Sequence, residues 1–444
     1  MKQRDNLFWI WLAECLGAAN RNFCTLMRYY ENPYELFHAE DVELERIDGI
    51  SERTVTALSN KNLERATEIL SSCERLGIRV LPYSDSEYPR ALREIDTPPV
   101  VLYCIGDISI LNQKLCIAMV GTRRMSEYGL RCAYKFSYEL AEAGSVIVSG
   151  MAAGIDGVCA AAALAAKGKT VAVLGCGLDV VYPKHHKKLM DEIRKNGILI
   201  SEYPPTTRPN HYHFPTRNRL ISGISQGTVV IEAGLGSGSL ITAKNAILQG
   251  KDVFTVPANL GTPGAEGTNG LLRDGATPVV KTSDILNYYQ FLFSNTLGMR
   301  GGNKTEARSN ADLGYLAEMG VIELIKRHTA GETEALEESP KAERGTGKAP
   351  PKRSGIKQAF PKKTMSDQPP TTTERMPKQT PDEVVSSLTP IQLAILQAIP
   401  DDRAVTVDSL SGLGYPFGDL IAALTMLEIL GLIQKLPGAL YTKS

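Results

Sequence analysis

The sequence lacks a net charge, a long apolar run and any regular spacing of cysteines. Its 444 residues hold 49 Lys plus Arg against 49 Asp plus Glu. The chain as a whole therefore carries no field that would attract a polyanion, and contact with nucleic acid must use a local patch. No apolar run approaches the ~18 residues that a membrane-spanning helix needs. The apolar stretch near the N-terminus is interrupted by Glu14, and Asp5 lies in its basic start, which disfavours a secretion signal.

The cysteines favour a reduced protein over a disulfide scaffold. The eight cysteines include no CxxC pair, and several lie within apolar runs, where a free Cys behaves as a small buried hydrophobe. This usage fits a reduced cytoplasm. We therefore expect a cytoplasmic protein without membrane contact, whose length suggests roughly two to four domains.

The central part of the chain, residues 76–300, alternates strand-like and helix-like segments. Apolar runs recur roughly every 25 to 30 residues from about residue 105. Such a spacing predicts an α/β fold, a doubly wound and mostly parallel sheet with right-handed crossovers. The predicted strands end at Val120, Ser149, Leu174, Ser201, Glu232, Val256 and Val280.

Residues 1–75 have a helical pattern. Within them, Ile47-Asp48-Gly49-Ile50-Ser51 separates two helical stretches. A Gly-centred turn before a helix presents free amides that can hold a phosphate, as in a helix-hairpin-helix element. A plain corner between two helices is the alternative.

The C-terminal part divides into a linker and a small domain. Residues 301–386, densest in Pro, Lys, Glu and Thr from about 329, predict a flexible linker. Residues 387–444 suggest three helices and a hairpin at Pro437-Gly438, the pattern of a winged-helix domain. Its expected recognition helix, 416–430, contains no Lys or Arg, which favours a protein contact over a DNA groove.

Glycine-rich turns follow the predicted strands. In open α/β sheets ligands bind outside the carboxyl ends of the strands, and there the sequence places 119–129, 149–157, 175–186 and 232–243. Ser237, Gly238 and Ser239 form a Ser/Gly turn before a helix, a geometry that can hold phosphate. Leu240 follows, so the Walker A pattern is absent and we expect no nucleotide-triphosphate hydrolysis and no cofactor.

The segment 208–223 interleaves aromatic rings with guanidiniums. Tyr212 and Phe214 alternate with Arg208, Arg217 and Arg219, the composition of a single-strand binding surface, where stacking contributes ~1 to 3 kcal/mol per base. The alternative is that Phe214-Pro215 packs into the core and the arginines pair with Glu202 or Glu232. His211 and His213 have no carboxylate or Cys at ligand spacing, so we expect no metal site.

In chain order, these turns resemble one known family. MVGTRRMSEYG, SGMAAGID, GCGLDVVYP, FPTRNRLISGIS, EAGLGSGSLITAKNAILQGKDVFTVP and GTNGLLRDGA look like the DNA-processing protein A family (DprA, also called Smf). The resemblance covers residues 80–285 closely and the flanks loosely, with a SAM or helix-hairpin-helix-like domain expected at 1–75. It implies an extended Rossmann-like domain that binds single-stranded DNA, forms a homodimer and assists a RecA-type recombinase in natural transformation.

The resemblance also implies the residues that contact DNA. Three positions depart from the family pattern, Ala153, Ala160 and Gly236, where basic residues or histidine are usual, so we expect a less basic pocket. The nominated DNA-binding residues are Gly121, Arg123, Phe214, Arg217, Asn218, Arg219, Ser237, Gly238 and Ser239.

The sequence therefore favours a DNA-binding accessory protein that is not an enzyme. The first alternative is a Rossmann-like nucleotide-processing enzyme, such as a phosphoribohydrolase, with Glu232 or Asp156 as the working carboxylate. Such an enzyme needs a carboxylate over a sugar, whereas the sequence supplies more arginine and aromatic residues than paired acids. The second alternative is an interaction scaffold that acts through the C-terminal domain.

Overall fold

A computed structural model describes residues 2–262, 264–297, 313–321, 388–400, 405–415, 432–436 and 440–443, together with 420, 423, 424 and 427. The chain divides into two compact units, Met1–Gly345 and Thr346–Ser444. Each unit is described by itself.

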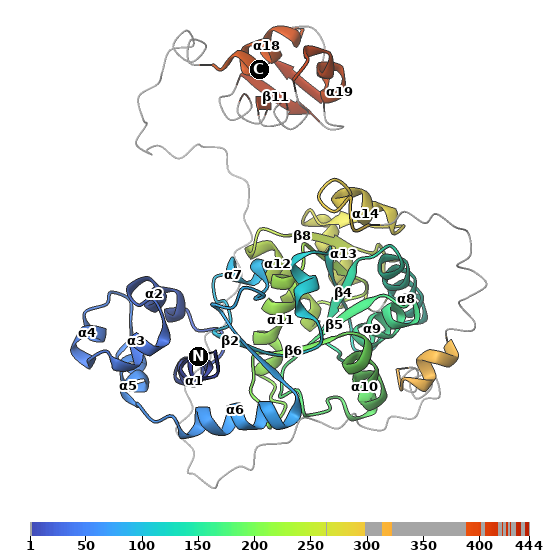
Figure 1. Ribbon diagram of the computed structural model, residues 1–444. Helices are drawn as coiled ribbons and strands as arrows, with labels where there is room; N and C mark the ends of the chain where they lie inside the picture. The colour runs from blue at the N-terminus through green and yellow to red at the C-terminus, as the bar shows by residue number, and fades with distance from the viewer. Residues whose placement is uncertain are drawn as a thin grey trace, which may run out of the picture. The chain divides into compact units, whose positions relative to one another are not determined.

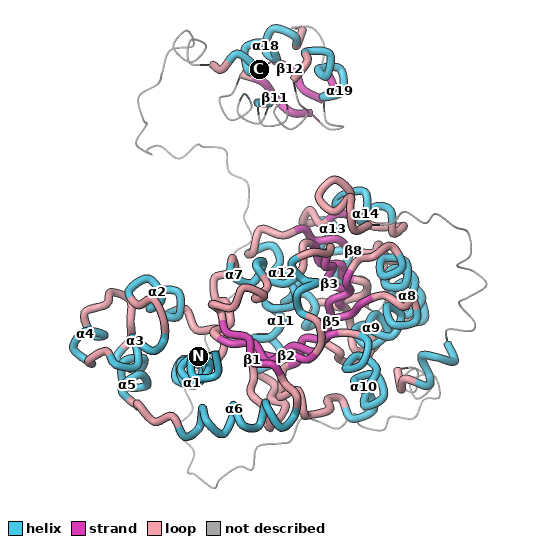
Figure 2. The backbone as a smooth tube through the Cα atoms, viewed as in Figure 1, coloured by secondary structure: helices cyan, strands magenta, loops and turns pink. Residues whose placement is uncertain are grey.

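A nine-stranded sheet forms the centre of the first unit, in the order β1-β2-β6-β5-β4-β3-β7-β8-β9. The strands from β6 to β9 in this order run parallel, whereas β2 pairs antiparallel with β6, and β1 with β2. Figure 2 shows them as one twisted array. The bounds are β1 Arg79–Pro82, β2 Val101–Ile105, β3 Cys116–Val120, β4 Val146–Ser149, β5 Lys169–Leu174, β6 Ile198–Ser201, β7 Gly227–Val230, β8 Asp252–Thr255 and β9 Thr277–Pro278.

Helices cover both faces of the sheet, because the strand side chains are apolar on both sides. β3, β4, β6 and β7 are buried along their whole length, as expected for parallel strands between two helical layers. α8 (Glu127–Glu142), α9 (Ile155–Ala165) and α10 (Lys187–Asn196) lie on one face, and α11 (His213–Ile224) and α12 (Gly238–Leu248) on the other (Figure 1).

The chain reverses its direction of winding beside β3. The crossovers through α8, α9 and α10 lead from β3 to β6, and α11 then returns the chain to β7 on the opposite side of β3. The turns after β3 and β7 therefore diverge to opposite faces. This arrangement opens a crevice at the carboxyl ends of the strands, the usual ligand position in such sheets.

Six helices precede the sheet: α1 Lys2–Leu16, α2 Asn22–Tyr29, α3 Pro33–His38, α4 Asp41–Glu45, α5 Glu52–Ser59 and α6 Glu64–Leu76. α6 ends at Gly77, whose left-handed φ of 63° closes the helix. Between α4 and α5, Gly49 has a φ of 85°, and Ser51 accepts the Thr54 amide as the N-cap of α5. Apolar side chains of these helices join the cluster under one face of the sheet.

The remaining helices that the structure describes in this unit are short. They are α7 Arg90–Arg93, η1 Ile108–Asn112, η2 Lys184–His186, α13 Glu266–Arg273 and α14 Ser283–Tyr289. A further helical segment covers 313–318. Leu316, Met319 and Val321 are buried in the same apolar cluster as α10, and Lys188 Nζ lies 2.9 Å from Glu318 Oε1. The expectation of a linker from residue 301 is therefore wrong for 313–321, because these buried apolar residues pack against the fold.

The second unit is small. It contains α18 (Pro390–Ala398), α19 (Val407–Leu410), η3 (Ser411–Leu413) and a three-stranded sheet of β10 (Val405–Thr406), β12 (Leu440–Lys443) and β11 (Ile433–Leu436). One apolar cluster that includes Ile395, Leu424 and Tyr441 holds it together. The predicted hairpin turn at 437–438 and most of the predicted helix 416–430 lie outside the described residues.

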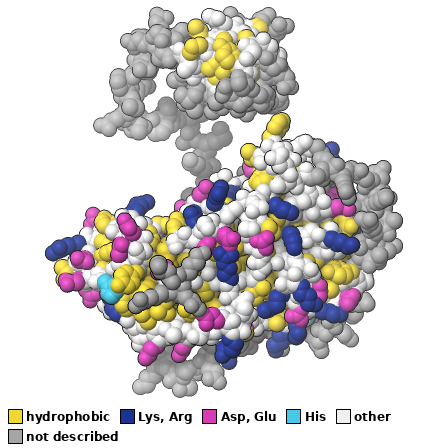
Figure 3. Space-filling view, in the orientation of Figure 1, with side chains coloured by type: hydrophobic (Ala, Val, Ile, Leu, Met, Phe, Trp, Pro, Cys, Tyr) yellow, Lys and Arg dark blue, Asp and Glu magenta, His cyan; other side chains and the backbone are white. Residues whose placement is uncertain are grey.

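The central sheet confirms the prediction of a mostly parallel α/β fold. β2 was not predicted, and β9 is shorter than the run ending at Val280 suggests. On the face shown in Figure 3, Lys and Arg are interspersed with Asp and Glu, in keeping with the balanced charge of the sequence. Among the described residues, no helix is both long and apolar enough to cross a membrane.

Candidate nucleic-acid interface

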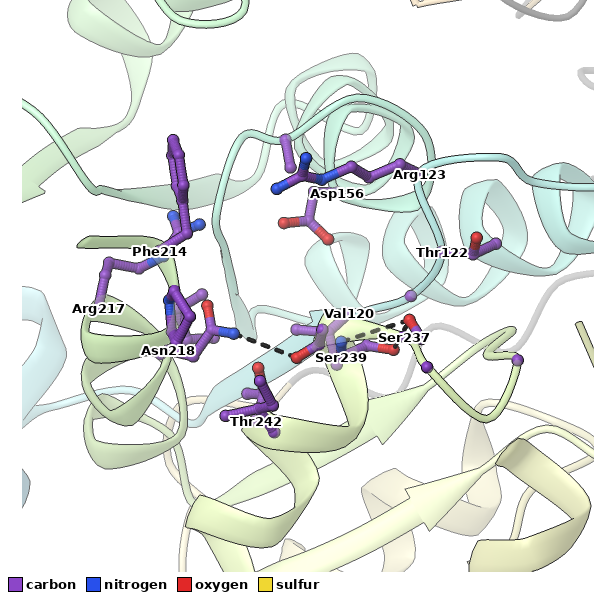
Figure 4. A pocket seen from close by; sticks show the side chains of 18 of the residues that line it. Val120, Thr122, Arg123, Asp156, Phe214, Arg217, Asn218, Ser237, Ser239 and Thr242 are labelled. Atoms are coloured by element: carbon purple, nitrogen blue, oxygen red, sulfur yellow. Dashed lines mark hydrogen bonds between the residues drawn. The ribbon is translucent and has the colours of Figure 1, made fainter. Parts of the chain in front are cut away.

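A cleft of about 610 Å³ lies at the carboxyl ends of the parallel strands, where the turns after β3 and β7 diverge. Its walls come from the turns after β3, β4, β5 and β7 and from the first turns of α11 and α12 (Figure 4). The residues that line it are Val120, Gly121, Thr122, Arg123, Arg124, Ala152, Asp156, Tyr182, His211, Phe214, Pro215, Arg217, Asn218, Ile221, Gly234, Gly236, Ser237, Gly238, Ser239, Ile241 and Thr242. All nominated residues except Arg219 are among them.

One face of α11 forms a wall of the cleft. Phe214, Arg217, Asn218 and Ile221 line it, the i, i+3, i+4, i+7 spacing that places side chains on one side of a helix. The N-terminus of α11 is fixed by His213, whose ring stacks on Tyr203 with centroids 4.0 Å apart. Its Nδ1 also lies 3.2 Å from Gly175 O, within hydrogen-bond distance.

Phe214 is surrounded by another ring and two cations. The Tyr182 ring stacks on it with centroids 5.3 Å apart and an angle of 28° between the planes. The guanidinium carbons of Arg123 and Arg217 lie 5.7 and 6.0 Å from the Phe214 centroid, within the range of a cation–π contact. The cleft therefore combines exposed positive charge at Arg123 with aromatic surface.

The N-terminus of α12 closes the other side. Ser237 is its N-cap and accepts the Ser239 amide at 3.4 Å, while the two hydroxyls lie 2.7 Å apart. Asn218 Nδ2 donates to Gly238 O at 3.2 Å, which joins α11 to this turn (Figure 4). The first amides of a helix lack partners within the helix and carry partial positive charge, so this turn can hold an anion such as phosphate.

Arg217 lines the cleft but is largely buried. Its side chain is only 4% exposed, and Nη1 donates to the carbonyls of Val173 and of Gly150, the latter at 2.8 Å. A Cβ at Gly150 would lie 2.6 Å from this nitrogen, so only glycine leaves room for the guanidinium. Arg217 therefore ties α11 to the ends of β4 and β5, in addition to its place in the cleft.

Asp156 lies between Arg217 and Arg123 at the N-terminus of α9 (Figure 4). Burial raises the pKa of its carboxyl, while Arg217, the amides of Gly150 and Ala152, and Arg123 oppose that shift. Burial likewise lowers the pKa of Arg217, and Asp156 opposes this. The carboxylate accepts the Gly150 amide at 3.1 Å, and it offsets part of the positive charge of the cleft.

Arg219 does not belong to the cleft, and this corrects the expectation that it joins Arg217. Residues two apart on a helix point about 200° from each other. Arg219 is 8% exposed, and its Nη2 donates to both carboxylate oxygens of Glu202 at 2.7 and 2.9 Å. The Ala19 amide lies 3.4 Å from the same carboxylate. Arg219 thus links α11 to β6 and to the N-terminal helices, the ion-pair alternative that the sequence left open.

Glu232, considered above as a working carboxylate, does not line the cleft. It accepts the amide and hydroxyl of Ser126, at 3.0 and 3.1 Å. Burial raises its pKa and Ser126 opposes the shift. Within the described ranges, no cluster of three His, Cys, Asp or Glu side chains is arranged to hold a metal ion. The two hydrogen bonds from Ser126 indicate that Glu232 stabilises the start of α8.

Two lining residues, Tyr182 and Arg124, are not among the nominated DNA-binding residues. Tyr182 and Arg124 follow the ends of β5 and β3, in the turns already singled out at this sheet edge. The position of these turns at the carboxyl ends of the strands is the sequence signal that points to both residues. The orientation of the Tyr182 ring against Phe214 depends on how α11 approaches the sheet, which no local pattern indicates.

Comparison with known proteins places the cleft inside a matched region. Residues 79–290 match the model of a family described as DNA recombination-mediator protein A. The chain is 42% identical over 217 residues to DNA processing protein DprA of Bacillus subtilis, covering 49% of this chain and 73% of that protein. It is 28% identical over 447 residues to Protein Smf of Synechocystis, with 100% of both chains covered.

The fold is also similar to a solved structure. The X-ray structure of DNA processing protein A from Streptococcus pneumoniae superimposes with a TM-score of 0.56 and 34% identity. The similarity covers 63% of this chain and 97% of that one.

Proposed function

Because this chain belongs to the DNA processing protein A (DprA/Smf) family, we propose that it binds single-stranded DNA in the cleft and helps to load a RecA-type recombinase during natural transformation and recombination. The family is one of recombination mediators, not of catalytic enzymes. The observation that carries the single-strand assignment is the meeting, in one cleft, of an exposed arginine, two stacked rings and the N-terminus of α12. Single-strand binders combine such charge and stacking surfaces.

Each part of the cleft has a proposed role. Arg123 contacts a backbone phosphate, as do the amides at Ser237, Gly238 and Ser239. Gly121 shapes the floor of the cleft: a Cβ there would lie 2.6 Å from Ile155 Cγ1, so glycine lets the turn after β3 pack closely against α9. Phe214 supplies aromatic surface.

The remaining nominated residues act on the shape of the site. Asn218 holds the first turn of α12 against α11 through Gly238 O. Arg217 fixes the ends of two strands beneath the ligand. Arg219, paired with Glu202 outside the cleft, supports α11 and makes no direct contact with DNA.

The flanking regions have proposed roles too. We propose that 1–75 is a SAM or helix-hairpin-helix-like domain, that 76–300 is the extended Rossmann-like DNA-binding domain, and that 387–444 is a winged-helix domain that contacts a protein. The proposed assembly is a homodimer. A dimer with one strand site per protomer holds two stretches of DNA close together, which raises the local concentration for nucleation of a recombinase filament.

The test is a titration of the purified full chain with single-stranded DNA, duplex of the same sequence and mononucleotides. We expect preference for single strand with little dependence on sequence, because stacking and phosphate contacts accept any base. Equal or tighter binding to duplex contradicts the proposal. Release of free base from a nucleoside monophosphate, lost in Glu232→Gln, would instead support the phosphoribohydrolase alternative.

The loading step needs its own assay. With single strand coated by a single-strand binding protein, addition of the chain should speed assembly of a RecA-type recombinase, read as the onset of its DNA-dependent ATP hydrolysis. Tight single-strand binding without any such acceleration would support the proposed DNA site but contradict the loading role.

A further inference from the structure

Tyr182 lies on the cleft wall and is the outer ring of a stacked pair. Its side chain is 36% exposed and lines the cleft, and its ring stacks on Phe214 with centroids 5.3 Å apart. Phe214 is fixed from beneath, since a Cβ at Gly175 would lie only 3.0 Å from Phe214 Cδ1. Because Tyr182 covers one side of Phe214, a planar group that approaches from that side meets the tyrosine ring.

The two rings come from different elements that are held together independently of any ligand. Phe214 is in the first turn of α11, and Tyr182 is in the turn after β5. The adjoining pair, Tyr203 and His213, stacks at 4.0 Å, and His213 Nδ1 lies 3.2 Å from Gly175 O. A ring surface that is already ordered loses little conformational entropy when a base stacks on it.

The hydroxyl of Tyr182 has no structural task. In the part of the chain that the structure describes, no hydrogen bond or ion pair involves it. Two other exposed tyrosines differ in this respect: the Tyr128 hydroxyl donates to Pro257 O at 2.9 Å, and the Tyr288 hydroxyl donates to Asp252 Oδ1 at 3.1 Å. The aromatic ring of Tyr182, and not its hydroxyl, therefore makes its contacts in the cleft.

From this arrangement we propose that Tyr182 is the base-stacking platform of the cleft, with Phe214 as the ring that supports it. A nucleobase of the bound strand stacks on Tyr182, while the adjoining phosphates lie toward Arg123 and the N-terminus of α12. This inference rests on the proposed single-strand binding. It assigns to Tyr182 the stacking role that the sequence assigned to Phe214.

Two variants of the full chain and one control test whether the ring or the hydroxyl of Tyr182 contributes to DNA binding. Tyr182→Phe keeps the ring and should bind single strand within about twofold of the natural chain. Tyr182→Leu keeps most of the volume but loses the aromatic face, and should bind about tenfold or more weakly, since loss of one stacked base costs ~1 to 3 kcal/mol. Tyr29→Ala, which changes a 62% exposed tyrosine on α2 outside the cleft, is the matched control and should bind normally.

An abasic strand identifies the partner of the ring. On a single strand of abasic residues, the natural chain should bind more weakly than on a normal strand, and Tyr182→Leu should cause no further loss. Thermal melting of each variant establishes that it is folded. Normal binding by Tyr182→Leu, or an equal loss on normal and abasic strands, would overturn the assignment of Tyr182. Absence of single-strand binding by the natural chain would instead overturn the proposed function itself.

Discussion

At the scale of single residues, Arg217 and Arg219 show that two arginines on one helix can have different roles. Both are on α11, but Arg217 faces the cleft and Arg219 faces the buried carboxylate of Glu202. The side chains of the Arg219–Glu202 pair are only 10% and 8% exposed. Removal of one partner from a buried pair leaves a desolvated charge, which destabilises far more than loss of a surface pair.

We therefore predict that Arg219→Ala lowers the free energy of unfolding by about 3 kcal/mol. Chemical denaturation measures this, and single-strand affinity per folded molecule should stay the same. The matched control is the double variant Arg219→Met with Glu202→Gln, which removes both charges and should recover much of the stability. If the Arg219→Ala chain is stable but binds DNA poorly, Arg219 contacts DNA and the prediction is wrong.

His186 supports the turn that carries Asp156. It is fully buried, its Nδ1 lies 3.1 Å from Met151 O, and its Nε2 has no partner among the described residues. Because a carbonyl only accepts, Nδ1 carries the proton in the neutral ring. Burial, with a smaller contribution from His185, lowers the pKa of His186 to about 4.

A depressed pKa makes stability depend on pH in a defined direction. The contribution of His186 is fully present above its ordinary pKa of 6.5 and is lost as the pH falls through about 4. Between pH 7 and pH 4.5 the natural chain should lose about 2 kcal/mol through this residue. His186→Asn, which keeps a donor near Met151 O, should lose correspondingly less over that interval in urea titrations. Parallel pH profiles of the two chains would contradict the assignment.

At the scale of helices and strands, the segment 313–321 is the main departure from expectation. Its Leu316 is 1% exposed, whereas Leu313 on the same short helix is 44% exposed. We predict that Leu316→Ala lowers the free energy of unfolding by about 2 kcal/mol or more. Leu313→Ala, the matched control, should change it by no more than about 0.5 kcal/mol. Equal effects of the two changes on thermal melting would show that the segment does not dock.

The central strands could be predicted because parallel strands buried on both faces appear as continuous apolar runs. β3, β4, β5 and β6 end at the residues that the sequence indicated. The antiparallel pairing of β2 with β6 could not be predicted, since Tyr103 and Ser201 meet only when the whole sheet assembles. The place of Arg219 was predictable in principle: the helical period alone separates it from Arg217.

At the scale of the whole molecule, the cleft is built entirely within the first compact unit. We predict that a chain ending at residue 386, without the C-terminal domain, binds single strand within about threefold of the full chain. The same truncated chain should lose any contact that the C-terminal domain makes with a protein. A loss of affinity beyond about tenfold, or ~1.4 kcal/mol, would place part of the DNA site in residues 387–444.

If the cleft holds the DNA backbone, Arg123 is the side chain whose loss should weaken binding most clearly. Arg123 lines the cleft with an exposed guanidinium near Phe214. Arg131 is 70% exposed on α8, pairs with Glu127 and does not line the cleft, so its loss changes the net charge equally. The measurement is the single-strand dissociation constant of Arg123→Ala and Arg131→Ala. We predict about tenfold weaker binding for Arg123→Ala with unchanged melting, and natural affinity for Arg131→Ala. Equal affinities for the two variants would show that the cleft does not hold the DNA backbone.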